Sequence, residues 1–124
     1  MIKTLLVVGA GSFIGGVGRY LISQCIQTKR VGAFPYGTLT VNVIGCFLIG
    51  IVFGISSKGN FNPTWQLFLT TGILGGFTTF SAFSMETVNL MRTGQAGSAM
   101  VYVTLSLVVG VFATFVGFSL AKMV

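Results

Sequence analysis

Hydrophobic residues form long runs along the chain, separated by short stretches rich in glycine, proline and polar residues. The four runs cover approximately Thr4–Ile26, Thr38–Ile55, Trp65–Met91 and Ser98–Ala121. Each is close to the roughly 20 residues that an α-helix needs to cross a bilayer. The pattern therefore predicts an all-α membrane protein with four transmembrane helices, organised as one transmembrane domain over residues 1–124.

The composition supports a lipid environment and limits the possible chemistry. Only 6% of the residues are charged, whereas a soluble domain has about 25%. The net charge of +6 comes from seven Lys and Arg scattered near the ends of the runs, against Glu86 alone. This distribution indicates headgroup anchors and no nucleic-acid surface. With no His and one carboxylate side chain, paired-carboxylate catalysis and a His/Cys metal cluster are excluded, and we expect no enzyme.

The positive charges are almost balanced between the two sides of the membrane. Four spans place both termini on one side, with Lys3, Lys58 and Lys122. The other side has Lys29, Arg30 and Arg92, with Arg19 nearer that end of its helix. Because Lys/Arg asymmetry normally sets orientation, this balance predicts insertion both ways and an antiparallel dual-topology homodimer. A fixed-orientation protein with weak signals is the alternative.

Small and polar residues recur every four positions, which places them on one helix face. The rows are Gly11–Gly15 in the first run, Asn42, Cys46, Gly50 and Gly54 in the second, and Ser98, Tyr102, Ser106, Gly110 and Thr114 in the fourth. Small residues allow helices to approach closely in lipid. The polar groups of Asn42, Tyr102 and Ser106 require a partner helix or a wet cavity, and the spacing leaves both possibilities open.

The stretch "GGFTTFSAFSME", from Gly75 to Glu86, interrupts the third run. Two glycines followed by two threonines predict that the helix breaks in mid-membrane, where freed backbone groups would form an ion site. The alternative is a kink at a close helix crossing. After the break, Phe80 and Phe83 share a face beside a row of serine hydroxyls. Hydroxyls and the positive edges of aromatic rings suit an anion that is losing water.

Arg19 lies inside the first run, where a charge is costly and is normally paired or functional. Glu86 is a candidate partner. Alternatively, Arg19 draws anions into a vestibule. The role of Glu86 stays open.

The segments "GGVGRY", "GTLTVNVIGCFLIG" and "GGFTTFSAFSME", in this order, resemble the Fluc (CrcB-type) fluoride channels over essentially the whole chain. The resemblance implies a fluoride-specific ion channel in the cell (inner) membrane. Such a channel exports cytoplasmic fluoride passively through two pores per antiparallel dimer. It also implies a structural sodium ion at the dimer centre, bound by the backbone carbonyls of Gly75 and Thr78.

The resemblance also suggests roles for side chains. Phe80 and Phe83 match rings that flank the pathways, and Asn42 matches a pathway amide. The remaining matches are Tyr102 and Ser106 as pathway lining, Thr79 and Ser81 beside them, Arg19 as the first-span arginine and Glu86 as a third-span glutamate. Ala82 and Gly110 depart from the family pattern, because a hydroxyl is common at the first position in family members and a serine can occur at the second.

Two other functions fit part of the pattern. A proton-coupled small multidrug exporter has similar length and topology, but it needs a carboxylate in its first span, and this first span has none. A scaffold subunit would explain the glycine rows, but it would leave Arg19 and the hydroxyl–aromatic segment unexplained.

Overall fold

The computed structural model describes residues 1–29, 32, 34–59 and 61–124, and the helices fill nearly all of these residues. Three spans are continuous helices: α1 (Ile2–Gln27), α2 (Tyr36–Ser56) and α6 (Ala96–Met123). The other span consists of α3 (Pro63–Leu67), the π-helix η1 (Phe68–Leu74), α4 (Gly75–Phe77) and α5 (Phe80–Arg92). Within the described residues, four helical segments are long and apolar enough to cross a membrane. The predicted all-α fold, with four helical segments able to span a membrane, is confirmed for the described residues.

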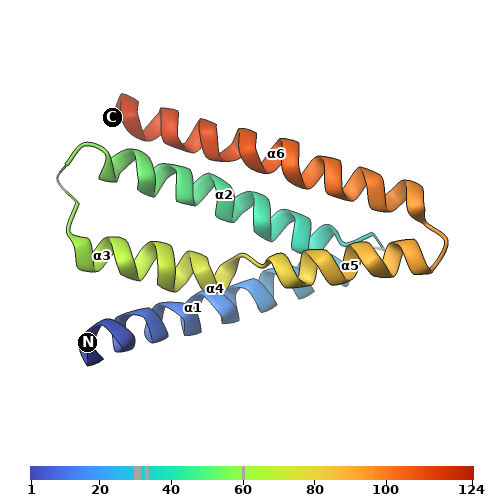
Figure 1. The fold of residues 1–124 in the computed structure, drawn as a ribbon, viewed down its shortest axis with the longest axis horizontal. Coiled ribbons are helices and arrows are strands. Elements are labelled where there is room, and N and C mark those ends of the chain that lie inside the picture. The colour runs from blue at the N-terminus through green and yellow to red at the C-terminus, as the bar shows by residue number, and fades with distance from the viewer. Residues whose placement is uncertain (30–31, 33, 60) are drawn as a thin grey trace.

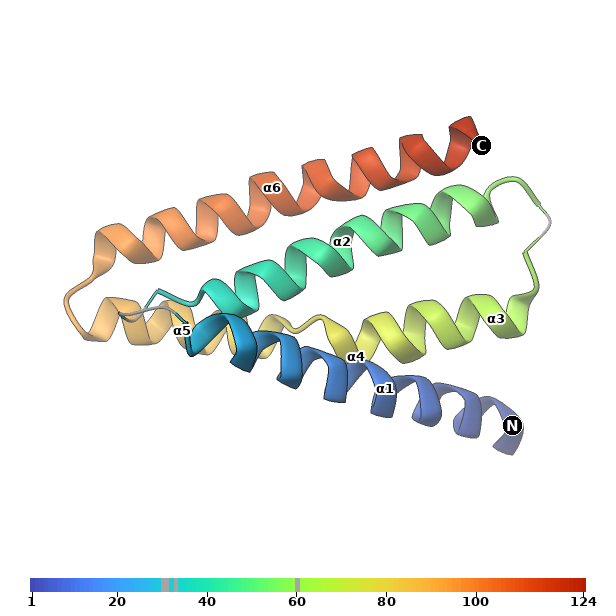
Figure 2. The same ribbon diagram turned by 180° about the vertical axis from the view of Figure 1, so that it is seen from behind.

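The spans lie side by side as an elongated bundle (Figure 1). Both termini and the α2–α3 connection, which carries Lys58, lie at one end, and the α1–α2 and α5–α6 connections lie at the other. The view from behind gives the same arrangement (Figure 2). Lys29 and Arg92 therefore lie at the end opposite the termini, as predicted, whereas Arg30 is outside the described residues.

Glycines bring the spans into close contact. A methyl group on Gly50 of α2 would overlap the Thr114 carbonyl of α6, and one on Gly117 of α6 would overlap the Phe47 carbonyl of α2. In the same way, Gly15 of α1 lies against the Ile73 carbonyl of η1. These glycines therefore lie on helix contact faces, because no larger side chain fits at their positions without separating the backbones.

Large apolar side chains cover the outside of the bundle. Phe13 on α1 is 73% exposed, and Phe112 and Phe115 on α6 are 66% and 67% exposed. In water such a surface would drive aggregation, whereas in a bilayer it faces the lipid chains. The fully buried side chains include Tyr102 and Leu90, which pack together where α5 meets α6.

Candidate functional site

The third span is interrupted between α4 and α5. α4 ends at Phe77, and α5 begins at Phe80. Between them, Thr78 has φ −91° and ψ 153°, and Thr79 has φ −149° and ψ 126°. Both residues are extended, so helical hydrogen bonds are lost on either side of them. The backbone groups at the interruption must find other partners.

The interruption does not fall at the double glycine. We predicted a break at Gly75–Gly76, but both residues are helical, and the break begins two residues later, at Thr78. Packing explains the difference. A methyl group on Gly76 would lie 2.6 Å from the Ser12 carbonyl oxygen of α1. Gly76 thus allows α4 to approach α1, and the β-branched threonines after it leave the helix.

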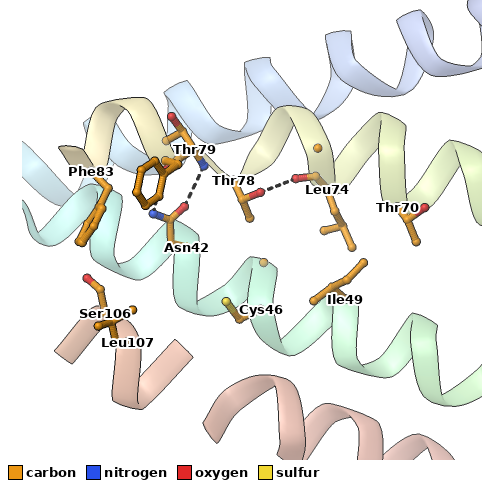
Figure 3. A pocket seen from close by; sticks show the side chains of 13 residues that line it. Asn42, Cys46, Ile49, Thr70, Leu74, Thr78, Thr79, Phe83, Ser106 and Leu107 are labelled. Atoms are coloured by element: carbon orange, nitrogen blue, oxygen red, sulfur yellow. Dashed lines mark hydrogen bonds between the residues drawn. The ribbon is translucent and has the colours of Figure 1, made fainter. Parts of the chain in front are cut away.

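Asn42 of α2 binds both backbone groups of Thr79. Its Oδ1 accepts a 3.0 Å hydrogen bond from the Thr79 N–H, and its Nδ2 donates a 3.1 Å bond to the Thr79 carbonyl. Figure 3 shows the Asn42 amide directed at Thr79, and both residues line the cavity. A single side chain thus replaces the helical partners that the extended conformation removes.

Arg19 of α1 stabilises the other side of the interruption. Its Nε donates a 3.2 Å hydrogen bond to the Gly76 carbonyl, and the side chain is half-buried. The suggested pairing of Arg19 with Glu86 is wrong: within the described residues Glu86 accepts from two hydroxyls and forms no ion pair. The arginine thus places its charge at the carbonyls of the break, because those groups have lost their helical donors.

Two carbonyls at the interruption lose their usual donors to side chains. In an α-helix the N–H of residue i+4 donates to the carbonyl of residue i. The Thr79 N–H, which would serve Gly75, donates to Asn42 instead. The Ala82 N–H, which would serve Thr78, donates to Thr79 Oγ1 at 3.2 Å. The Gly75 and Thr78 carbonyls are therefore left without their helical partners.

Glu86 is held by two hydroxyls from other helices. Thr38 Oγ1 of α2 donates to one carboxylate oxygen at 3.1 Å, and the Tyr102 hydroxyl of α6 donates to the other at 3.2 Å. Thr38 and Tyr102 are buried. This cluster joins α2, α5 and α6 and gives the protein's single side-chain carboxylate two hydrogen bonds at a half-buried position.

Three aromatic rings form a continuous series beside this cluster. The Phe80 and Phe83 centroids are 5.6 Å apart, and the Phe83 and Tyr102 centroids are 5.0 Å apart. Exposure falls along the series: Phe80 is 78% exposed, Phe83 is half-buried and Tyr102 is fully buried. The series therefore runs from the surface of this chain to the Glu86 cluster.

A cavity of about 390 Å³ lies against the interruption. Figure 3 shows α2, α6 and the broken span around it. Seven of the predicted site residues line it: Asn42, Gly75, Thr78, Thr79, Phe80, Phe83 and Ser106. Four others do not: Arg19, Ser81, Glu86 and Tyr102. No charged side chain lines this cavity among the residues that the structure describes.

Ser81 and Ser106 differ in their hydrogen bonding at this site. The Ser81 hydroxyl lies 3.2 Å from Thr79 Oγ1, on the exposed side of the break. The buried Ser106 Oγ has no hydrogen-bond partner within the described part of the chain. In Figure 3 its oxygen points toward Phe83. A buried hydroxyl without a partner costs free energy, so this position is suited to a hydrogen-bonding ligand or water.

Thr38 and Cys46 also belong to this region, although neither was among the predicted site residues. Cys46 lines the cavity, and Thr38 binds Glu86. Both lie on the face of Asn42, one helical turn away on either side. Extending the polar row of α2 by one turn toward the N-terminus would have found Thr38.

The donor groups limit which metal could bind. Within the described residues, no group of three or more His, Cys, Asp or Glu side chains could hold an ion. Neutral oxygens, among them backbone carbonyls, are a further kind of ligand, and they suit a hard cation. The Gly75 and Thr78 carbonyls fit this requirement, because their helical donors are engaged elsewhere.

Comparison with known proteins gives concordant matches. Residues 6–118 match the family model described as CrcB-like protein, Camphor Resistance (CrcB). The chain is 43% identical to the fluoride-specific ion channel FluC of Parabacteroides distasonis over 122 residues, 98% of this chain and 94% of that protein. Its identity to the proteins of the same name from Flavobacterium psychrophilum and Methylobacillus flagellatus is 41% and 42%. These matches cover 97% and 96% of this chain, and 98% and 94% of the two relatives.

Proposed function

The chain belongs to the CrcB-like family, and from this premise we propose that it is a fluoride-specific ion channel. It lets cytoplasmic fluoride leave the cell passively, down its electrochemical gradient. Hydrogen fluoride is a weak acid that crosses lipid in neutral form and dissociates in a less acidic cytoplasm. A channel in the cell (inner) membrane removes the trapped anion without ATP, and the chain has no nucleotide-binding P-loop motif.

The observation that carries this proposal is the lining of the cavity at the helix interruption. The unpartnered Ser106 hydroxyl and the rings of Phe80 and Phe83 lie there, with no charged side chain among the described lining residues. A hydroxyl donates to a small anion, and the positive edge of a ring assists as the anion loses water. Without a charged side chain in the lining, no ion pair holds the anion, so it enters and leaves readily.

A second copy in the opposite orientation completes the pathways. Phe80 is 78% exposed in the single chain, although it lines the cavity. An inverted partner on this face would cover the ring and enclose two symmetry-related pathways. The balanced charge at the two ends supports insertion in both orientations. With one chain carrying every element, residues 1–124 act as one transmembrane domain and pair as a homodimer.

In this dimer the interruption lies near the middle of the membrane, and the Gly75 and Thr78 carbonyls of both copies hold a sodium ion. Each chain supplies two carbonyl oxygens, and two chains supply four, a plausible set for a hard cation. The ion contributes positive charge between the pathways. Arg19 and Asn42 keep the neighbouring Gly76 and Thr79 carbonyls hydrogen-bonded, so that these groups do not compete for it.

The other site residues have separate roles in the proposal. Ser106 lines the cavity part of the pathway on α6, Tyr102 borders its inner end, and Glu86 is held beside it by hydroxyls. Thr79 and Ser81 present hydroxyls on the exposed side of the break. Asn42 has a second amide N–H beyond the one given to Thr79, which is available to an anion in the cavity.

Flux from proteoliposomes tests the proposed function. The protein is reconstituted into vesicles loaded with potassium fluoride, and valinomycin lets potassium follow the anion. A fluoride electrode should record rapid efflux, while matched potassium chloride vesicles should release no chloride above the protein-free rate. Exchange of a quaternary ammonium drug against protons would instead indicate an exporter, and the absence of any flux would indicate a scaffold.

A further inference from the structure

Side-chain oxygens accept the two backbone N–H groups that would serve the proposed cation ligands in an unbroken helix. An unbroken helix would direct the Thr79 N–H to the Gly75 carbonyl and the Ala82 N–H to the Thr78 carbonyl. Asn42 Oδ1 takes the first at 3.0 Å, and Thr79 Oγ1 takes the second at 3.2 Å. Each diverted donor corresponds to one carbonyl of the proposed pair.

We infer that Asn42 and the Thr79 hydroxyl are positioning residues that create the cation site, by holding the two N–H groups that would otherwise occupy its carbonyls. This inference rests on the proposed channel with its sodium ion, and it gives Asn42 a function beyond lining the anion pathway. Neither side chain needs to touch the cation. They act by keeping the Thr79 and Ala82 N–H groups away from the Gly75 and Thr78 oxygens.

The two residues act from different directions. Asn42 belongs to α2, and its second bond, from Nδ2 to the Thr79 carbonyl at 3.1 Å, fixes the orientation of the extended residue. Thr79 acts locally as the N-cap of α5. Thr78 is also fixed, because its N–H and its hydroxyl both donate to the Leu74 carbonyl, at 3.0 and 2.8 Å. The break is therefore held from within the span and from a neighbouring helix.

Each test substitution removes one of the two side-chain acceptors, that of Asn42 or that of Thr79. Asn42→Leu has similar volume but neither accepts nor donates a hydrogen bond. Thr79→Val keeps the shape of the side chain but loses the accepting oxygen, and Thr79→Ser restores it. Thr87→Val is the matched control, because the Thr87 hydroxyl donates to the helical Phe83 carbonyl and diverts no N–H.

The readout is the thermal unfolding midpoint in detergent as sodium replaces N-methylglucamine at constant ionic strength. We expect sodium to raise the midpoint of the parent, of Thr87→Val and of Thr79→Ser with similar half-saturating concentrations. In Asn42→Leu and Thr79→Val that concentration should rise about tenfold or more, since each carbonyl regains a competing donor. A lower midpoint with unchanged sodium dependence would show a merely structural role and overturn the inference.

The sodium dependence of unfolding tests the positioning role, and fluoride efflux tests the channel function separately. If Asn42→Leu does not fold, Thr79→Val against Thr79→Ser decides the question alone. A parent whose midpoint ignores sodium would refute the cation site and the inference with it. Fluoride efflux is measured on the same parent preparation. If efflux is present although sodium does not raise the midpoint, the channel function is still supported.

Discussion

The Tyr102 hydroxyl on α6 donates a 3.2 Å hydrogen bond to the carboxylate of Glu86 on α5. Tyr102 is fully buried, and Thr38 supplies the only other hydrogen bond to this carboxylate within the described structure. The pair thus fastens two consecutive spans at the inner end of the aromatic series. It also places the chain's one acidic side chain beside the proposed pathway.

Tyr102→Phe should lower stability and slow fluoride efflux. The substitution keeps the ring but removes one of the two hydrogen bonds to the half-buried Glu86 carboxylate, which should cost about 1 kcal/mol. Denaturant unfolding in detergent, with flux measured on the same preparation, checks both effects. The matched control is Tyr20→Phe, because the Tyr20 ring is 60% exposed and its hydroxyl accepts an exposed bond from Gln24. Equal stability of the two variants would contradict the role given to the Tyr102–Glu86 hydrogen bond.

Gly50→Ala should separate α2 from α6. The added methyl overlaps the Thr114 carbonyl, which is backbone and has little freedom to move, so overpacking should cost about 1–3 kcal/mol or prevent folding. Gly9→Ala is the control on α1, where no heavy atom lies within 4 Å of the new methyl. That variant should be neutral or stabilised by up to about 1 kcal/mol through helix propensity. Unfolding midpoints of the two proteins provide the comparison, and a stable Gly50→Ala protein would refute the close α2–α6 contact.

Ser106→Ala should reduce fluoride efflux while leaving stability nearly unchanged. The hydroxyl has no partner in the described structure, so its removal breaks no internal hydrogen bond. Thr104→Val removes an exposed hydroxyl from the same helix and should leave efflux at the parental rate. If both variants conduct like the parent, Ser106 does not contribute to the pathway.

Added charge at one end should fix the orientation of the chain. Ser57→Lys with Thr64→Lys loads the end that holds the termini, and Thr28→Lys with Thr93→Lys loads the opposite end. Each double variant alone should lose most fluoride efflux, because all copies would insert the same way. Co-expression of the two should restore it. Full activity of either double variant by itself would contradict the antiparallel dimer.

The spans and their contact faces could be predicted from the sequence because each depends on local pattern. Apolar runs of bilayer length gave all four helical segments, and the four-residue spacing placed Gly50 and Gly15 on faces that meet other helices. These features need only the helical period and the size of the side chains.

The hydrogen bonds at the interruption could not be predicted in the same way. The break begins at Thr78 because Gly76 is required against Ser12, a contact 64 positions away in the chain. Arg19 bonds the Gly76 carbonyl and does not bond Glu86, although charge alone favours the ion pair. These hydrogen-bond partners depend on which backbone groups the fold leaves without helical partners, and the composition does not show which groups those are.

Fluoride is proposed to cross the membrane beside the helix interruption, past the rings of Phe80 and Phe83. The most direct measurement is fluoride efflux from vesicles containing Phe80→Ile or Phe83→Ile, each at parental reconstitution and dimer content. Each variant should lose most of the parental rate, because an aliphatic side chain fills similar space but has no positive ring edge for the anion. Parental efflux rates in both variants would contradict this pathway.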